Sequence, residues 1–182
     1  MKNATYESSF NGLFELITQL RGPAGCSWDR EQSRESMKRQ LLEEVYELID
    51  AIDEGDSGHV VEEIGDVLAQ IVFQAAFGVE TGEFSVEDIF RLEVEKLVRR
   101  HPHIFSKVRT KESNQVASQW EEIKLEERGR SESFLTGVAK SQPALALAQA
   151  LQERAAMIGF DWEDVGGVVC KVREEIDELM NA

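Results

Sequence analysis

The sequence contains few cysteines and no long hydrophobic run. Its two cysteines, Cys26 and Cys170, are too few for a disulfide framework, which favours a reducing cytoplasm as the location of the protein. No apolar run approaches the length of a membrane-spanning helix, because the longest candidate, residues 68–79, is interrupted by two glutamines. Residues 1–10 lack the hydrophobic region of a secretory signal peptide. We therefore expect a cytoplasmic protein without a membrane partner.

Basic residues are also scarce relative to acidic ones. The 182 residues include 20 Lys and Arg against 35 Asp and Glu, which gives a formal net charge of −15 at pH 7. A nucleic-acid partner requires a basic surface to contact its phosphate backbone, so we expect no such partner. The same charge is compatible with a nucleotide that binds through a metal ion. The length allows one domain, or one domain and a fragment, and 42% hydrophobic residues can form a core.

Two helices with matching hydrophobic stripes are predicted around two short acidic runs. In each helix the apolar residues recur with helical spacing and form one stripe. The stripes are Leu41, Leu42, Val45, Leu48, Ile49 and Ile52, and Val60, Val61, Ile64, Val67, Leu68 and Ile71. Glu44 and Glu47 flank the first stripe. At about 100° per residue, Glu63 and Asp66 flank the second stripe at the same two angular positions.

The segment between these helices, residues 53–59, is rich in turn-forming residues. A connection this short makes the two helices antiparallel neighbours. If the stripes face each other, both acidic pairs lie in one groove, where two charges about 5 Å apart cost about 3 kcal/mol. A divalent cation would turn this repulsion into coordination, and ligands that are all oxygen favour Mg²⁺ or Mn²⁺. We therefore predict one Mg²⁺ site formed by the two acidic pairs.

Two other interpretations of the acidic runs are less favoured. A solvated acidic face is common for a single Glu-rich helix, because Glu is a good helix former. Two runs matched in phase across a hairpin make that interpretation weaker. A di-iron bundle would need Glu-x-x-His on its helices, and neither helix contains this pattern.

The spacing of the acidic residues resembles the signature of a known enzyme family. Glu-Glu-x-x-Glu followed by Glu-x-x-Asp is similar to the pattern of the MazG-type nucleoside triphosphate pyrophosphohydrolases, members of the all-α NTP pyrophosphatase superfamily. The residues that match it are Glu43, Glu44, Glu47, Glu63 and Asp66. The resemblance runs from about residue 10 to the C-terminus and includes residues 26–32, 95–105 and 120–124. In the first of these segments, Ser27 stands where the family usually has Pro.

The resemblance implies an all-α antiparallel helical bundle that forms a homodimer. It also implies a Mg²⁺-dependent reaction, NTP + H₂O → NMP + PPi, in which water attacks the α-phosphorus and aberrant nucleotides are removed. By resemblance, the metal ligands are Glu44, Glu47, Glu63 and Asp66, and the substrate-binding residues are Lys96, Arg99, Arg100, Trp120, Lys124 and Trp28. A carboxylate near the metal, that of Glu43 or Glu47, could accept the proton of the attacking water.

The substrate-binding residues also have structural interpretations. Cations at the end of a helix, such as Lys96 and Arg100, interact favourably with the helix dipole. The functional interpretation is a phosphate clamp, because a guanidinium group can donate two parallel hydrogen bonds. Trp28 fits a lid on the core, and Trp120 fits a packed helix interface. The resemblance assigns both Trp side chains to the nucleotide site instead.

The chain is predicted to contain one complete domain and part of a second. Helices are expected over about residues 10–20, 35–53, 57–80, 86–100, 111–128 and 144–158, and in the last segment. The predicted parts are a MazG-like domain at residues 1–128, a linker at 129–142 and an incomplete second repeat at 143–182. In this repeat, residues 174–182 align with residues 43–51, but no Glu-x-x-Asp follows. Glu175 and Glu178 are therefore not expected to form an independent metal site.

Two other functions fit parts of the sequence. The chain could be a catalytically silent module that binds nucleotides or interacts through its helices. It could also be a dUTP or dCTP diphosphatase on the same scaffold. The His-Pro-His segment at residues 101–103 and the Trp-x-x-x-Lys segment at residues 120–124 favour the MazG-type enzyme over that diphosphatase.

Overall fold

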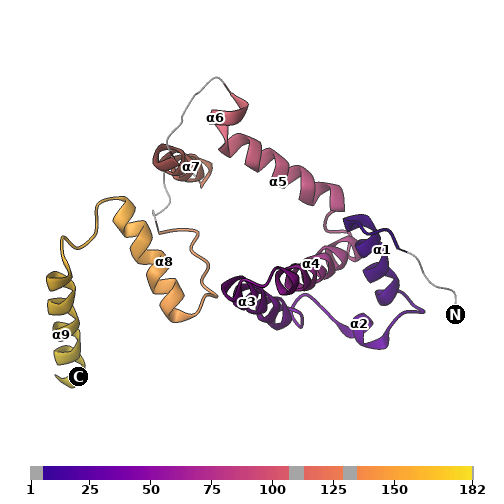
Figure 1. The fold of residues 1–182 in the computed structure, drawn as a ribbon, viewed down its shortest axis with the longest axis horizontal. Helices are drawn as coiled ribbons and strands as arrows, with labels where there is room; N and C mark the ends of the chain where they lie inside the picture. The colour runs from indigo at the N-terminus through magenta and orange to yellow at the C-terminus, as the bar shows by residue number, and fades with distance from the viewer. Residues whose placement is uncertain (1–5, 107–112, 129–134, 182) are drawn as a thin grey trace. The chain divides into compact units, whose positions relative to one another are not determined.

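A computed structural model of the chain describes residues 6–106, 113–128 and 135–181. All regular secondary structure within these ranges is helical, which confirms the predicted all-α fold (Figure 1). The helices are α1 (Phe10–Arg21), α2 (Ser27–Glu31), α3 (Lys38–Glu54), α4 (Ser57–Glu80), α5 (Val86–Arg100), α6 (Pro102–Phe105), α7 (Ser113–Arg128), α8 (Ala144–Met157) and α9 (Val165–Asn181). Residues 111–112 and 129–134, where a helix start and a linker are predicted, lie outside the described residues.

The chain divides into two compact units, Met1–Leu97 and Val98–Ala182, and the boundary falls within α5. The first unit is organised around α4, which packs along α3 and against α1 (Figure 1). Its core consists of the buried side chains Ile17, Val72 and Ala76, surrounded by Phe10, Leu13, Phe14 and Phe73. Burial of a large aliphatic side chain contributes about 1.5–3 kcal/mol, so this core holds α1 on α4.

A short turn at Gly55 and Asp56 joins α3 to α4. Gly55 adopts a left-handed conformation with φ of 74°, which glycine tolerates because it has no Cβ. The Asp56 carboxylate caps α4 by accepting hydrogen bonds from the backbone N–H groups of Gly58 (2.8 Å) and His59 (3.4 Å). These local interactions produce the hairpin that the turn-rich segment predicts.

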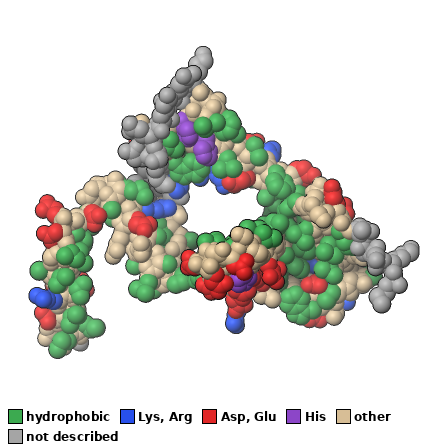
Figure 2. All heavy atoms as spheres, in the orientation of Figure 1, with side chains coloured by type: hydrophobic (Ala, Val, Ile, Leu, Met, Phe, Trp, Pro, Cys, Tyr) green, Lys and Arg blue, Asp and Glu red, His purple; other side chains and the backbone are tan. Residues whose placement is uncertain are grey.

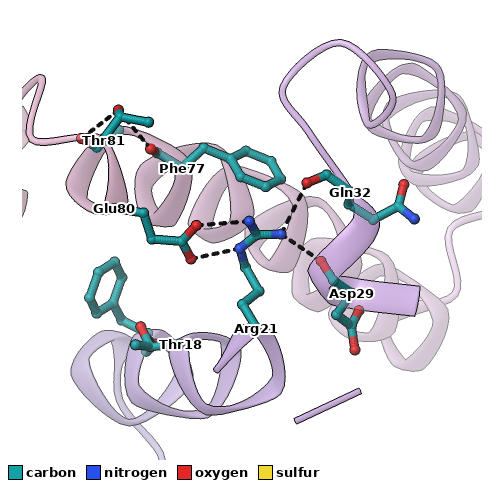
Figure 3. A network of polar contacts seen from close by, with 9 residues as sticks. Thr18, Arg21, Asp29, Gln32, Phe77, Glu80 and Thr81 are labelled. Atoms are coloured by element: carbon teal, nitrogen blue, oxygen red, sulfur yellow. Dashed lines mark hydrogen bonds and ion pairs between the residues drawn. The ribbon is translucent and has the colours of Figure 1, made fainter. Parts of the chain in front are cut away.

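Residues 26–32 differ from their prediction. The predicted helices do not cover this segment, whereas the structure contains the short helix α2. The Arg21 guanidinium accounts for this helix, because it donates hydrogen bonds to the backbone oxygens of Asp29 (2.5 Å) and Gln32 (3.2 Å) (Figure 3). Carbonyl groups at a helix end otherwise lack partners within the helix. A side chain from another helix therefore stabilises this single turn.

The same guanidinium group binds the end of α4. It donates hydrogen bonds of 2.7 and 2.8 Å to the Glu80 carboxylate and lies 4.2 Å from the centre of the Phe77 ring (Figure 3). The Arg21 side chain is only 9% exposed, while that of Glu80 is 39% exposed. Arg21 thus joins the ends of α1, α2 and α4.

Replacement of Arg21 by Ala is expected to lower the free energy of unfolding by about 2 kcal/mol, because the Glu80 carboxylate and the Gln32 carbonyl lose their guanidinium donor and the Asp29 carbonyl keeps only the backbone N–H of Gln32. Urea unfolding followed by circular dichroism measures this change. Lys38→Ala is the control, since it removes an exposed ion pair with Glu35 and is expected to cost less than about 0.5 kcal/mol. Equal losses for the two variants would contradict the role of Arg21.

The helix α5 begins with reciprocal hydrogen bonds. The backbone N–H of Asp88 donates to the Ser85 hydroxyl (3.1 Å), and the N–H (3.1 Å) and hydroxyl (2.7 Å) of Ser85 donate to the Asp88 carboxylate. This arrangement is a capping box in which Ser85 is the N-cap residue. Hydrogen bonds from Arg91 and Ser85 hold the pKa of the Asp88 carboxyl below its usual range.

The second unit contains the last turn of α5 and the helices α6 to α9. Pro143 is the N-cap residue of α8, and Arg154 of α8 donates hydrogen bonds to the backbone oxygens of Thr136 (2.6 Å) and Gly137 (3.4 Å). Among the described residues, no helix has both the length and the apolar composition needed to cross a membrane.

Candidate active site

Three acidic side chains from α3 and α4 lie close together. One carboxylate oxygen from each of Glu44, Glu63 and Asp66 lies within 4.8 Å of the other two. Glu44 belongs to α3, while Glu63 and Asp66 are one turn apart on α4. Figure 2 shows Asp and Glu side chains gathered over these two helices. The hairpin therefore brings together three of the four residues that the sequence predicts as metal ligands.

Glu63 is the most buried member of this group. Only 6% of its surface is exposed, and its Oε2 has no hydrogen-bond partner among the described residues. Its Oε1 lies 3.1 Å from Nε2 of His59, whose Nδ1 lies 3.1 Å from the Glu54 carboxylate. Burial of a carboxylate oxygen without a partner is costly, and a cation at that oxygen would remove the cost. The residues present thus fit a divalent ion.

The pKa of Glu44 also reflects this crowding. Burial raises the pKa of the Glu44 carboxyl above its usual value, and the charges of Glu47, Asp66 and Glu63 raise it further. A hydrogen bond from the Gln70 side chain acts in the opposite direction. The repulsion predicted from the helical phase is therefore present in the structure, and a positive charge in the group would reverse it.

The two predicted proton acceptors have different surroundings on α3. Glu43 is exposed and accepts a hydrogen bond of 2.8 Å from Nε of Arg39, one turn earlier. Glu47 lies one turn after Glu44 and contributes to its raised pKa. Among the described residues, however, no oxygen of Glu47 belongs to the group of three carboxylates. Glu47 therefore affects Glu44 through electrostatic repulsion between the two carboxylates.

The two predicted phosphate-binding arginines form a second cluster with an acidic residue of α7. Glu127 accepts hydrogen bonds from Nε of Arg99 (2.6 Å) and from Nη2 (2.6 Å) and Nε (3.1 Å) of Arg100. Hydrogen bonds from Arg100 and Arg99 hold the pKa of the Glu127 carboxyl below its usual value. The Arg100 guanidinium lies 5.4 Å from the Trp120 ring centre, and the His101 ring meets Trp120 edge-on at 4.9 Å.

The other predicted substrate-binding residues have separate positions. Lys96 forms an ion pair with Glu93 on its own helix, α5. Lys124 is half-buried on α7, one turn after Trp120. Trp28 lies on α2 and is 50% exposed, so it covers the core at most in part.

The segment that contains the acidic hairpin matches a known protein family. Residues 32–105 match the family described as the MazG nucleotide pyrophosphohydrolase domain. The chain is 45% identical over 174 residues to the nucleoside triphosphate pyrophosphohydrolase/pyrophosphatase MazG of Thermotoga maritima, which covers 95% of this chain and 67% of that protein. The chain belongs to the MazG family. The resemblance read from the acidic signature is thereby confirmed, and so is the enzyme class, hydrolases of phosphoric anhydride bonds.

Two further comparisons support membership of the MazG family. The chain is 44% identical over 171 residues to the nucleoside triphosphate pyrophosphohydrolase of Escherichia coli strain K12, covering 92% of this chain and 65% of that protein. A crystal structure of a mazG-related protein from Thermotoga maritima matches with a TM-score of 0.53 at 28% identity, covering 63% of this chain and 97% of that one. The chain spans about two thirds of the length of the two sequence relatives.

Sequence reasoning did not identify two side chains that contact the acidic group of this MazG-family chain. Gln70 hydrogen-bonds Glu44, and His59 contacts Glu63. The positions of Glu63, Asp66 and Gln70 follow the i, i+3, i+7 pattern of one helix face, which was a usable signal. His59 lies one turn before Glu63, but it belongs to the turn-rich segment and so gave no helical signal.

Proposed function

We propose that this chain is a Mg²⁺-dependent nucleoside triphosphate pyrophosphohydrolase that removes aberrant nucleotides. Its reaction would be NTP + H₂O → NMP + PPi. The proposal rests on the buried Glu63 carboxylate. Its Oε2 has no hydrogen-bond partner among the described residues, and the carboxylates of Glu44 and Asp66 lie beside it. The relatives from Thermotoga maritima and Escherichia coli are named for this type of reaction, which supports the same chemistry here.

Glu44, Glu63 and Asp66 would hold the ion, with Glu47 as a further carboxylate. A site made only of carboxylate oxygens suits a hard cation, Mg²⁺ or its substitute Mn²⁺. When bound, the ion supplies positive charge that offsets the charge of phosphoryl oxygens and lowers the pKa of water. Without that charge, the three clustered carboxylates repel one another.

Glu47 and Glu43 are the candidate acceptors for the proton of the attacking water. As the water oxygen bonds to the α-phosphorus, its proton passes to the carboxylate. The bond between the α-phosphorus and the bridging oxygen then breaks, and pyrophosphate leaves. We favour Glu47, because its charge acts on Glu44, whereas Glu43 is held by Arg39 at 2.8 Å.

Cationic and aromatic residues would bind the rest of the nucleotide. Guanidinium groups donate paired hydrogen bonds to phosphate oxygens and offset the charge that builds up on pyrophosphate. An indole ring stacks on a base because both present flat π surfaces. The proposed phosphate contacts are Lys96, Arg99, Arg100 and Lys124, and the proposed aromatic contacts are Trp120 and Trp28.

Phosphorus NMR of the protein with a panel of NTPs and dNTPs, with and without Mg²⁺, tests the reaction. We expect NMP and pyrophosphate only when Mg²⁺ is present, and the panel also ranks the bases. Formation of NDP and phosphate would contradict attack at the α-phosphorus. Binding without product across the panel would favour the catalytically silent module.

We further propose that the protein forms a homodimer through the outer face of the α3–α4 hairpin. Within the first unit, only part of each predicted hydrophobic stripe is covered. The exposed members are Leu42, Ile49, Ile52, Val61, Ile64, Leu68 and Ile71. Extended apolar surface of this kind usually marks an interaction site. Because the exposed members belong to both helices of one hairpin, the same hairpin of a second copy can cover them in a four-helix arrangement.

Ile71→Glu is expected to convert the dimer to a monomer, because it places an unpaired charge in the proposed interface. Size-exclusion chromatography with light scattering measures the mass. Leu92→Glu is the matched control, since Leu92 is an apolar residue of similar exposure on α5 (58% against 48%) and its substitution should leave the dimer intact. A monomeric wild-type protein, or a dimeric Ile71→Glu variant, would overturn the proposed interface.

We infer that the last part of the chain repeats the first acidic helix and does not form a metal site by itself. The proposed division is a catalytic domain at residues 1–128, a linker at 129–142 and the repeat at 143–182. In the repeat, Glu174 and Glu175 form ion pairs with Lys171 at 2.7 and 3.1 Å. Within the described part of the chain, the one acidic group close enough to hold an ion is that of α3 and α4.

We also infer a cytoplasmic location without nucleic-acid or membrane partners. Cys26 and Cys170 are both free thiols, which is usual in a reducing compartment. The net charge of −15 would repel the phosphate backbone of a nucleic acid.

A further inference from the structure

Glu127 holds the two arginines that are proposed to contact phosphate. Its Oε1 accepts a hydrogen bond of 2.6 Å from Arg99, and its Oε2 accepts bonds of 2.6 and 3.1 Å from Arg100. The side chains of Arg100 and Glu127 are only 17% and 21% exposed. Such shielded, charge-assisted hydrogen bonds hold a side chain far better than exposed ion pairs do. Glu127 therefore holds the Arg100 guanidinium in the absence of a ligand, and it also pairs with Arg99, whose side chain is 54% exposed.

The pairing uses only one side of each guanidinium group. Glu127 contacts Nε of both arginines and Nη2 of Arg100. The Nη1 atoms of Arg99 and Arg100 remain outside this pairing. A guanidinium group has five N–H donors in a planar fork, so donors remain for a second anion. The carboxylate thus orients both cations without occupying all of their donors.

Glu127 also lies on the face of α7 that carries the proposed nucleotide contacts. Positions 120, 124 and 127 follow the i, i+4, i+7 pattern of one helix face. On this face, Trp120 lies against both the Arg100 guanidinium and the His101 ring. Glu126, the adjacent acidic residue, is exposed and falls on a different face by the same periodicity. Glu127 thus pairs with both arginines of α5 from the helix face that also carries Trp120.

We propose that Glu127 is a positioning residue for nucleotide binding, which holds the guanidinium groups of Arg99 and Arg100, the second of them beside Trp120, so that their remaining donors meet the triphosphate. This inference rests on the proposed function. Two adjacent cations repel each other, and a long side chain loses conformational entropy when a ligand immobilises it. Glu127 offsets both costs before the nucleotide arrives, which is the general advantage of preorganisation.

The opposite role would be that of a placeholder, in which the Glu127 carboxylate competes with phosphate for the arginines. Removal of a placeholder would tighten nucleotide binding, because the site would become more positive. Removal of a positioning residue weakens binding despite that gain in positive charge. The direction of the change in affinity therefore distinguishes the two roles.

Calorimetric titration of full-chain variants with an α,β-methylene NTP analogue and Mg²⁺ measures this affinity without turnover. The analogue carries the base that the wild type prefers, or adenine if no turnover is found. We expect Glu127→Ala to raise Kd about tenfold and Glu127→Gln, which keeps one acceptor oxygen, to raise it less. Glu126→Gln, which removes the same charge one residue away, should leave Kd unchanged. Unchanged or tighter binding by both Glu127 variants would overturn the proposal.

A double-mutant cycle separates positioning from a general structural role. If Glu127 acts through the arginines, Glu127→Ala should add no further loss to an Arg99→Ala, Arg100→Ala variant. A full additional loss in that background would overturn the proposal. Circular dichroism shows which variants fold. If Glu127→Ala does not fold, the Kd of Glu127→Gln tests the proposed role instead. If the wild type binds nucleotides without forming product, the proposed reaction is refuted. The role of Glu127 is still tested by the change in Kd and by the double-mutant cycle.

Discussion

Glu63→Gln is expected to abolish pyrophosphate release while the helical structure survives. Gln has nearly the same shape as Glu, so the packing of α4 against α3 is kept. The variant loses a charged ligand for the ion, and a loss of about 4 kcal/mol in transition-state stabilisation is about a thousandfold in rate. Pyrophosphate release measured by phosphorus NMR gives the rate, and far-ultraviolet circular dichroism gives the helix content.

The same substitution is expected to change how Mg²⁺ affects stability. An ion that binds only the folded state raises the melting temperature of the wild type, and Glu63→Gln should lose this increase. Without Mg²⁺, the variant should be at least as stable as the wild type, because it removes a buried charge that lies beside Glu44 and Asp66. Thermal unfolding with and without Mg²⁺ measures both effects.

The control for this experiment is Glu62→Gln, which removes the same charge from the exposed neighbour of Glu63 and should retain activity. Asp66→Asn should behave like Glu63→Gln. An active Glu63→Gln enzyme would refute the metal site. A high-affinity Mg²⁺ site that persists in this variant would show that the charge of Glu63 is not needed to hold the ion.

The acidic hairpin could be predicted because it depends on local information. Helical periodicity determines that Glu63 and Asp66 share a face, and residues such as Gly55 and Asp56 determine where one helix ends and the next begins. An antiparallel connection then brings Glu44 to the same side as the pair on α4. Each of these steps uses residues that are close in the sequence.

The parts of the structure that escaped prediction depend on residues far apart in the sequence. Arg21 stabilises α2 and binds Glu80 at the end of α4, and neither contact leaves a periodic signal. Glu127 joins Arg99 and Arg100 in the same way, although nothing in its spacing from them indicates a pairing. Helical periodicity also predicts each hydrophobic stripe as one continuous surface, whereas the packing of α3 on α4 covers only part of each stripe.

Arg100→Ala is expected to lower kcat/KM about a hundredfold, which corresponds to about 2.7 kcal/mol of lost transition-state stabilisation. Arg100 is the better shielded of the two arginines on Glu127, with 17% of its side chain exposed against 54% for Arg99. A charge in shielded surroundings interacts more strongly with phosphate than one in water. Arg100→Lys should recover only part of the loss, because an ammonium group lacks the planar fork of the guanidinium.

Steady-state kinetics of pyrophosphate release measures this effect, with Arg91→Ala as the control on the same helix. Arg91 pairs with Asp88 and Glu95, outside the proposed nucleotide contacts, so its removal should leave kcat/KM unchanged. A raised KM with unchanged kcat would mean that Arg100 binds substrate and transition state equally. A lowered kcat would mean that its contact strengthens as charge builds up on the departing pyrophosphate. Wild-type efficiency in a folded Arg100→Ala variant would exclude Arg100 from the phosphate site.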